Sequence, residues 1–275
     1  MQKKTDKHSI SDMMNEKELL EWYLAAGVDA ICGDVPGCLQ QKAPLRERPT
    51  AVGETASRPA ITDLAQMSLK ACKNAREVCE AAATLEELRA AVEAFDGCSL
   101  KLTSNKTVFG GGNPKAKIMI VGEAPGADED RIGEPFVGRS GHLLDKMLTA
   151  VGLDRGKVYI TNVLPWRPPG NRTPTSAEVA VCLPFLRRQI ELMKPEIIMV
   201  LGGSAANSLL DNEEPISRLR GKWLEYKTLK GDTAALLASF HPAYLLRNPA
   251  QKSKVWADLL RLCLLYTSPS PRDPK

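Results

Sequence analysis

From Cys98 onward, short apolar runs alternate with stretches of helical periodicity, and no other feature constrains the fold as much. The apolar runs cover residues 117–122, 158–164, 197–201 and 234–240. They lack polar alternation, which is typical of strands buried on both faces. Helical patterns lie at residues 140–151, 176–193, 203–210 and about 250–262. This βαβ alternation predicts the α/β class, with a mostly parallel four-stranded sheet, helices on both of its faces and right-handed crossovers.

The preceding part of the chain carries different patterns. Residues 17–31 predict an amphipathic helix, and residues 33–61 are rich in Pro, Gly, Arg and Thr, as in a flexible linker. Residues 62–95 predict two helices, the second with Thr84 as its N-cap. We therefore divide the chain into an N-terminal helical segment, a linker, a helical lead-in, a catalytic domain and a tail, at residues 1–32, 33–61, 62–97, 98–262 and 263–275.

Bulk properties fit a protein of the cytoplasm. The net charge of +4 permits a polyanionic partner without demanding one. No apolar run approaches the ~20 residues of a membrane span, and the first 20 residues lack the apolar core of a signal peptide. We predict no membrane partner, no obligate protein partner, a monomer, and seven cysteines without disulfides.

The last 13 residues stand apart. The stretch from Cys263 to Asp273 reads CLLYTSPSPRD and resembles the translation of a sequencing adapter. We exclude it from functional reasoning.

Polar residues follow three of the four predicted strands. The first strand runs into Gly122-Glu123-Ala124-Pro125-Gly126, a stiff turn followed by three acids, Asp128, Glu129 and Asp130. The pattern GxxxxGK[ST] is missing, so a nucleoside triphosphate site is excluded. The acids could bind a divalent metal, although consecutive acids more often form a solvated face.

The other strand ends carry base-recognition chemistry. Phe136, in the loop Pro-Phe-Val-Gly, is placed to plug the core or to stack on a planar ring. Asn162 ends the second strand with an amide that matches a nucleobase edge. His241 follows the fourth strand, before a predicted loop in which Leu245 and Leu246 could enter a base stack and Arg247 could hold a phosphate. Carboxyl ends of parallel strands converge, so these groups share one edge.

Together, the motifs GEAPG, PFVG, TNVL with RPPGNR, and HPAYLLR resemble, in order and spacing, those of family-4 uracil-DNA glycosylases. The resemblance covers residues 98–262. It implies a three-layer α/β/α sandwich that hydrolyses the N-glycosidic bond of uracil in DNA and leaves an abasic site. The partner is then uracil-containing DNA.

The resemblance also implies roles for individual residues. Glu123 would hold the attacking water beside a pocket that includes Gly122 and Ala124. Phe136 would stack on the flipped base, Asn162 would read its O4 and N3 edge, and His241 would donate to O2 of the leaving uracil. Glu129 and Asn171 are also linked with catalysis in the family. Chemistry supports a donor at O2, because cleavage builds negative charge on the base. Which of Glu123, Glu129 and Asn171 positions the water stays open.

The cofactor pattern departs from the family. Family-4 enzymes hold a 4Fe–4S cluster through four cysteines, and here only Cys98 and Cys182 occupy those places, with Phe95 and Trp166 at the other two. Two thiolates cannot hold a standard Cys₄ cluster, so we predict no cofactor and a hydrophobic plug in its place.

Two further points concern substrate and class. Gly126 stands where another glycosylase family has a bulky Tyr that rejects thymine, so we expect tolerance of other deaminated bases. A non-catalytic lesion-binding module on the same fold is the rival interpretation. An α/β-hydrolase is excluded, because the chain lacks a G-x-S-x-G elbow and Ser204, in GGSAA, is better placed as a helix N-cap.

Overall fold

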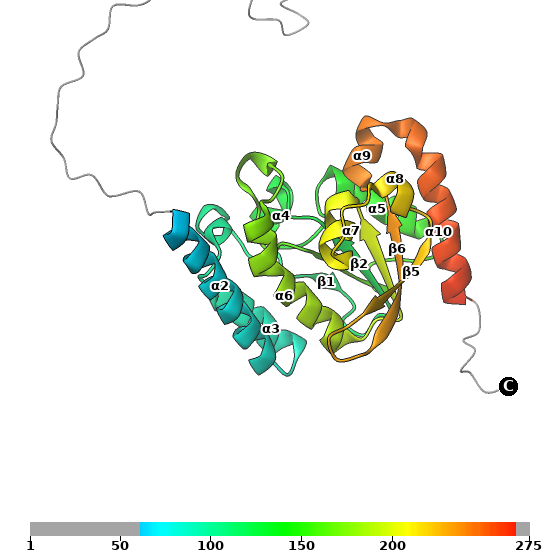
Figure 1. Ribbon diagram of the computed structural model, residues 1–275. Helices are drawn as coiled ribbons and strands as arrows, with labels where there is room; N and C mark the ends of the chain where they lie inside the picture. The colour runs from blue at the N-terminus through cyan, green and yellow to red at the C-terminus, as the bar shows by residue number, and fades with distance from the viewer. Residues whose placement is uncertain (1–60, 268–275) are drawn as a thin grey trace, which may run out of the picture. The chain divides into compact units, whose positions relative to one another are not determined.

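Six strands form one sheet in the computed structural model, which describes residues 61–267 (Figure 1). The strands are β1 (Gly111–Gly112), β2 (Ile118–Gly122), β3 (Val158–Asn162), β4 (Ile197–Leu201), β5 (Trp223–Lys227) and β6 (Thr233–Ser239). Their spatial order is β1-β3-β2-β4-β6-β5. The four predicted strands lie parallel at the centre, and each is buried or nearly so. The predicted α/β class is confirmed.

The predicted number of strands was wrong, because two antiparallel strands add to the edges. β1 pairs with β3, and β5 pairs with β6. β5 alternates between exposed and more buried residues, with Trp223 38% exposed and Tyr226 7% exposed. A search for continuous apolar runs finds strands buried on both faces and misses such an edge strand.

Helices cover both faces of the sheet, as Figure 1 shows. On one face pack α2 (Ile61–Ala81), α3 (Leu85–Ala94), α6 (Ser176–Met193) and α7 (Gly203–Leu210). On the other face pack α5 (Arg139–Thr149), α9 (Pro242–Arg247) and α10 (Lys252–Thr267). Alternate residues of β2 serve the two cores, with Met119 and Val121 facing the first and Ile118 and Ile120 the second. The remaining short elements are η2 (Ser99–Thr103), α4 (Ala127–Ile132), η3 (Pro169–Asn171), α8 (Ile216–Leu219) and η4 (Pro249–Gln251).

Local signals explain where several helices begin. Thr84 caps α3 through a capping box with Glu87, as predicted. The predicted cap at Ser204 was wrong, because α7 begins after Gly202, whose φ of 102° suits a glycine, and Ser204 lies inside the first turn. The predicted loop around Leu245–Arg247 was also wrong: His241 caps α9 there, and Pro242 occupies the first helical position.

The helical lead-in packs directly on the core. Arg188 of α6 donates to the carbonyl of Ala82 at 2.6 Å, and Arg89 of α3 donates to that of Gly110 at 3.0 Å. The predicted helix at 17–31, residues 33–60 of the predicted linker and residues 268–275 of the tail lie outside the described residues, and Ile61, the last residue of the predicted linker, begins α2. Between residues 61 and 267, no helix is both long and apolar enough to cross a membrane.

Candidate active site

A cavity of about 340 Å³ opens at the carboxyl ends of β2, β3 and β6. Most of the residues selected from the sequence line it: Glu123, Ala124, Glu129, Phe136, Asn162, Asn171, His241 and Arg247. Topology explains this convergence, because parallel neighbouring strands deliver their final residues to one edge. Ser140, Arg172 and Tyr244 also line the cavity, and the sequence analysis assigned them no role, although Arg172 and Tyr244 lie within the motifs RPPGNR and HPAYLLR.

His241 enters the cavity as a neutral hydrogen-bond donor. Its Nδ1 accepts the backbone N–H of Ala243 at 3.1 Å, so the imidazole carries its proton on Nε2. Burial, which is the largest cause, and the charge of Arg247 lower the pKa of His241 to about 4 against the opposing charge of Glu129. At neutral pH the ring is therefore uncharged and can donate one hydrogen bond from Nε2.

Glu123 follows β2 and lines the cavity with its carboxylate half-buried. Burial raises the pKa of Glu123, and a hydrogen bond with Ser204 opposes that change. Its backbone carbonyl accepts the N–H of Leu164 at 3.1 Å, which continues the pairing of β2 and β3 beyond the strand ends. A carboxylate of raised pKa is suited to accept a proton near neutral pH.

Glu129 has a different environment. Oε1 accepts the backbone N–H groups of Val137 and Gly138, each at 2.9 Å, and Oε2 accepts that of Gly126 at 3.1 Å. Both oxygens are thus committed to the backbone of the two loops that flank the cavity. The three acids of this segment do not converge: buried Asp130 accepts from Asn105 at 2.6 and 2.7 Å.

The side chains of Phe136 and Asn162 pack closely against Gly122. A Cβ on Gly122 would lie 2.4 Å from Oδ1 of Asn162 and 2.7 Å from the Phe136 ring, so only glycine fits. Gly122 therefore supports the cavity floor without lining the cavity. The Phe136 ring stacks near His241, with centroids 5.4 Å apart and planes at 29°. Donor, amide and aromatic wall thus lie within one small space.

Polar loop residues surround the mouth. Asn171, with a φ of 55°, accepts from Nε of Arg167 at 2.7 Å through Oδ1. Arg172 makes two bonds to Glu178, at 2.6 and 2.9 Å, and this pairing lowers the pKa of Glu178 to about 2. The Oδ1 atom of Asn171 is therefore already used as the acceptor for Arg167.

The α9 residues selected from the sequence separate. Arg247 lines the cavity and Leu246 is 39% exposed, but Leu245 is fully buried against the second core. A helix turns consecutive side chains by about 100°, so neighbours cannot share one face. Leu245 packs under the site and does not line it.

Cys98 and Cys182 meet in the first core, with their Sγ atoms 3.8 Å apart. Next to them, Phe95 and Trp166 stack with centroids 6.4 Å apart, and Phe185 contacts both rings edge-on at 5.1 and 6.3 Å. Trp166 is fully buried, and its Nε1 donates to Thr107 at 3.0 Å. Among residues 61–267, no group of three or more His, Cys, Asp or Glu side chains is assembled that could hold a metal ion.

The sequence is similar to those of known proteins over most of the described residues. The family model of the uracil DNA glycosylase superfamily matches residues 109–260. A type-4 uracil-DNA glycosylase of Pyrobaculum aerophilum is 41% identical over 179 residues, which cover 64% of this chain and 91% of that protein. A type-4 uracil-DNA glycosylase of Archaeoglobus fulgidus is 46% identical over 169 residues, covering 60% and 84%. A type-5 uracil-DNA glycosylase of Pyrobaculum aerophilum is 30% identical over 166 residues, covering 54% and 72%. The chain belongs to the uracil DNA glycosylase superfamily, on its type-4 branch.

Proposed function

We propose that this protein hydrolyses the N-glycosidic bond of uracil in DNA and leaves an abasic site. The observation that carries the proposal is His241, which lines the cavity as a neutral imidazole with its proton on Nε2. Cleavage transfers negative charge to the base, and a fixed donor at uracil O2 stabilises that charge where it develops. A neutral donor does so without first releasing or taking up a proton.

The other cavity residues supply recognition and water. A nucleotide must leave the duplex before its glycosidic bond can be reached. Phe136 stacks on the flipped base, and the Asn162 amide pairs with O4 and N3. The C1′–N1 bond breaks, the electron pair leaves with uracil, and water oxygen bonds to C1′ while Glu123 takes the water proton. Glu123 suits this role because its carboxylate is not consumed by the backbone, whereas all the oxygen atoms of Glu129 are.

The test is an oligonucleotide with one uracil, compared with the same oligonucleotide carrying thymine. We expect alkali-sensitive strand breaks at uracil alone and free uracil in solution. Binding of the uracil strand with no release would instead identify a non-catalytic lesion-binding module.

We also propose that no 4Fe–4S cluster forms. Two thiols with Sγ atoms 3.8 Å apart and a packed aromatic cluster are a donor set and a space that do not fit four-cysteine ligation. Protein purified without oxygen should lack the visible absorption of thiolate–iron bonds and contain no stoichiometric iron. Brown protein with four irons per chain would overturn this proposal.

The substrate range extends, we propose, to other deaminated bases. Gly126 lines the cavity, and a Cβ there would lie 2.7 Å from Oε2 of Glu129. The hydrogen bond between Glu129 and the Gly126 backbone therefore leaves no room for a bulky side chain that would reject a larger base. A panel of oligonucleotides carrying single deaminated bases tests the range. Release of uracil alone would limit the enzyme to that base.

DNA contacts come from α9 in this proposal. Leu246 is exposed and Arg247 lines the cavity mouth, so Leu246 enters the base stack and Arg247 holds a flanking phosphate. Arg247→Ala should weaken DNA binding and reduce its dependence on salt by about one phosphate contact. An unchanged salt dependence would exclude the phosphate contact. A monomeric state and a cytoplasmic location stay predictions.

A further inference from the structure

The backbone of Phe136 adopts a conformation that needs external support. Its φ is 55°, in the left-handed region that bulky residues rarely enter. Its carbonyl also presses on α5, where a Cβ on Gly141 would lie 1.7 Å from the Phe136 oxygen. Such backbone conformations persist only where surrounding groups hold them. The residues that hold Phe136 therefore decide where its ring stands.

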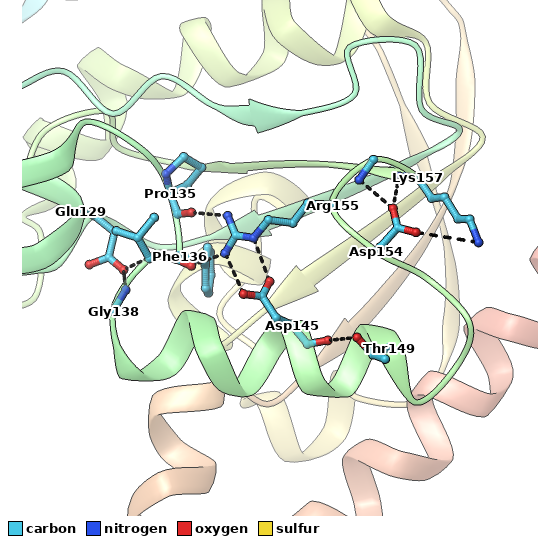
Figure 2. Close-up of polar contacts among 11 residues, drawn as sticks. Glu129, Pro135, Phe136, Gly138, Asp145, Thr149, Asp154, Arg155 and Lys157 are labelled. Carbon is cyan, nitrogen blue, oxygen red and sulfur yellow. Dashed lines mark hydrogen bonds and ion pairs between the residues drawn. The ribbon is translucent and has the colours of Figure 1, made fainter.

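Arg155 holds this loop from behind, as Figure 2 shows. It lies between α5 and β3. Its guanidinium donates to the carbonyl of Pro135 at 3.1 Å and also to the carbonyl of Phe136. Asp145 of α5 fixes the guanidinium, accepting from Nε at 2.8 Å and from a terminal nitrogen at 3.4 Å. One planar fork thus joins two loop carbonyls to a helix.

Glu129 holds the next residues of the same loop with opposite charge. It accepts the N–H groups of Val137 and Gly138, both at 2.9 Å. Carbonyls at 135 and 136 therefore meet a cation, and amides at 137 and 138 meet an anion. Charge-assisted bonds on both sides leave the loop little freedom to slide.

We propose that Arg155, anchored by Asp145, is a positioning residue that sets the Phe136 ring as the stacking wall of the base pocket. This inference rests on the proposed function, because it assigns the ring to the flipped base. Arg155 does not line the cavity, so it acts through the loop and not on the substrate.

A direct contact with DNA phosphate is the other outcome that must be separated. The Arg155 side chain is 33% exposed, and its donors already serve two carbonyls and a carboxylate. A phosphate contact would contribute to the binding of any DNA, whereas loop positioning affects only steps that use the pocket. Affinity for undamaged duplex therefore distinguishes the two.

The first experiment compares Arg155→Ala with Lys157→Ala. Lys157 lies two residues away, and its replacement by alanine also removes one positive charge. Its ammonium group donates to the Gly152 carbonyl and does not contact the Phe136 loop. It pairs with Asp154, as Figure 2 shows. We expect kcat/KM for uracil release to fall about 100-fold in Arg155→Ala, the scale of a misplaced substrate-positioning group. Inhibition by free uracil should weaken in parallel, while undamaged duplex binds as before. Lys157→Ala should keep wild-type values.

A double-mutant cycle tests the route through the ring. In a Phe136→Ala background, Arg155→Ala should cost little more, because the ring it positions is already gone. Arg155→Lys keeps the charge but not the planar fork, so it should not restore activity. Asp145→Asn is the milder variant should Arg155→Ala fail to fold, with a smaller loss in the same direction.

Besides a fully active Arg155→Ala variant, three results would overturn the proposal. They are an equal loss in the Phe136→Ala background, full activity in Arg155→Lys, and equally weakened binding of undamaged duplex. Wild-type protein that releases no uracil would instead contradict the proposed function. An active wild type with a fully active Arg155→Ala variant would reject the positioning role alone.

Discussion

Replacing Glu129 with glutamine removes one of the two oxygen atoms that together accept three backbone N–H groups. Oε1 of Glu129 accepts two backbone N–H groups, and Oε2 accepts the N–H of Gly126. The residue is buried, with only 7% of its surface exposed. Glutamine keeps one oxygen and turns an N–H₂ group toward a third backbone donor. A hydrogen bond to a charged group contributes ~1.5–3 kcal/mol. Losing one of these three hydrogen bonds and weakening the other two should lower the free energy of unfolding by about 3 kcal/mol.

Urea unfolding measures this change directly. The matched control is Asp128→Asn, one residue away, where the carboxylate is exposed and, among the described residues, pairs only with Arg131 at 3.2 Å. Exposed pairs contribute little, so this control should stay within ~0.5 kcal/mol of wild type. Glu129→Gln should release uracil more slowly, with the same dependence of the rate on pH as the wild type. Glu123→Gln should abolish the fall in rate that the wild type shows at acidic pH. A Glu129→Gln protein as stable as wild type with a displaced pH profile would refute the structural role.

Two other substitutions test the core and the histidine. Trp166→Ala empties a fully buried site and should lower the free energy of unfolding by ~3–5 kcal/mol. Trp256→Ala, at a residue that is 44% exposed, should lower it by less than ~1 kcal/mol. Equal losses in urea unfolding would reject the packing role of the aromatic cluster of Phe95, Trp166 and Phe185. The pKa of His241 is about 4 when folded and ordinarily 6.5, so the unfolded chain binds a proton that the folded chain refuses, and stability falls as pH drops below 6.5. Between pH 7 and 5, the free energy of unfolding of the wild type should fall by about 2 kcal/mol more than that of His241→Gln. Identical falls in both proteins would contradict a lowered pKa of His241.

The sequence predicted the centre of the fold well because burial on both faces leaves a direct mark. The runs at 117–122, 158–164 and 197–201 contain three of the parallel strands, the run at 234–240 matches the fourth to within one residue, and residues after three of them line the cavity. Parallel topology then brings together residues as distant as Glu123 and His241. Edge strand β5 escaped, because its alternation resembles that of an exposed segment.

Local chemistry at the site was harder to predict. The stretch Leu245–Arg247 reads as a loop next to Pro242, yet proline at the first helical position starts α9 and turns Leu245 into the core. Glu129 is an acid among acids in the sequence, and only the fold shows that three backbone amides surround it. Arg155 belongs to no motif, and its partners lie 10 to 20 residues away along the chain.

The role of His241 is measured most directly by single-turnover release of uracil from one oligonucleotide by wild type and by His241→Ala. A preorganised donor to the leaving base predicts rapid release by wild type and a loss of 10²–10³-fold in the variant, with both proteins equally folded by circular dichroism. If His241→Ala releases uracil at the wild-type rate, the imidazole does not stabilise the departing base, and the mechanism proposed for this cavity is wrong.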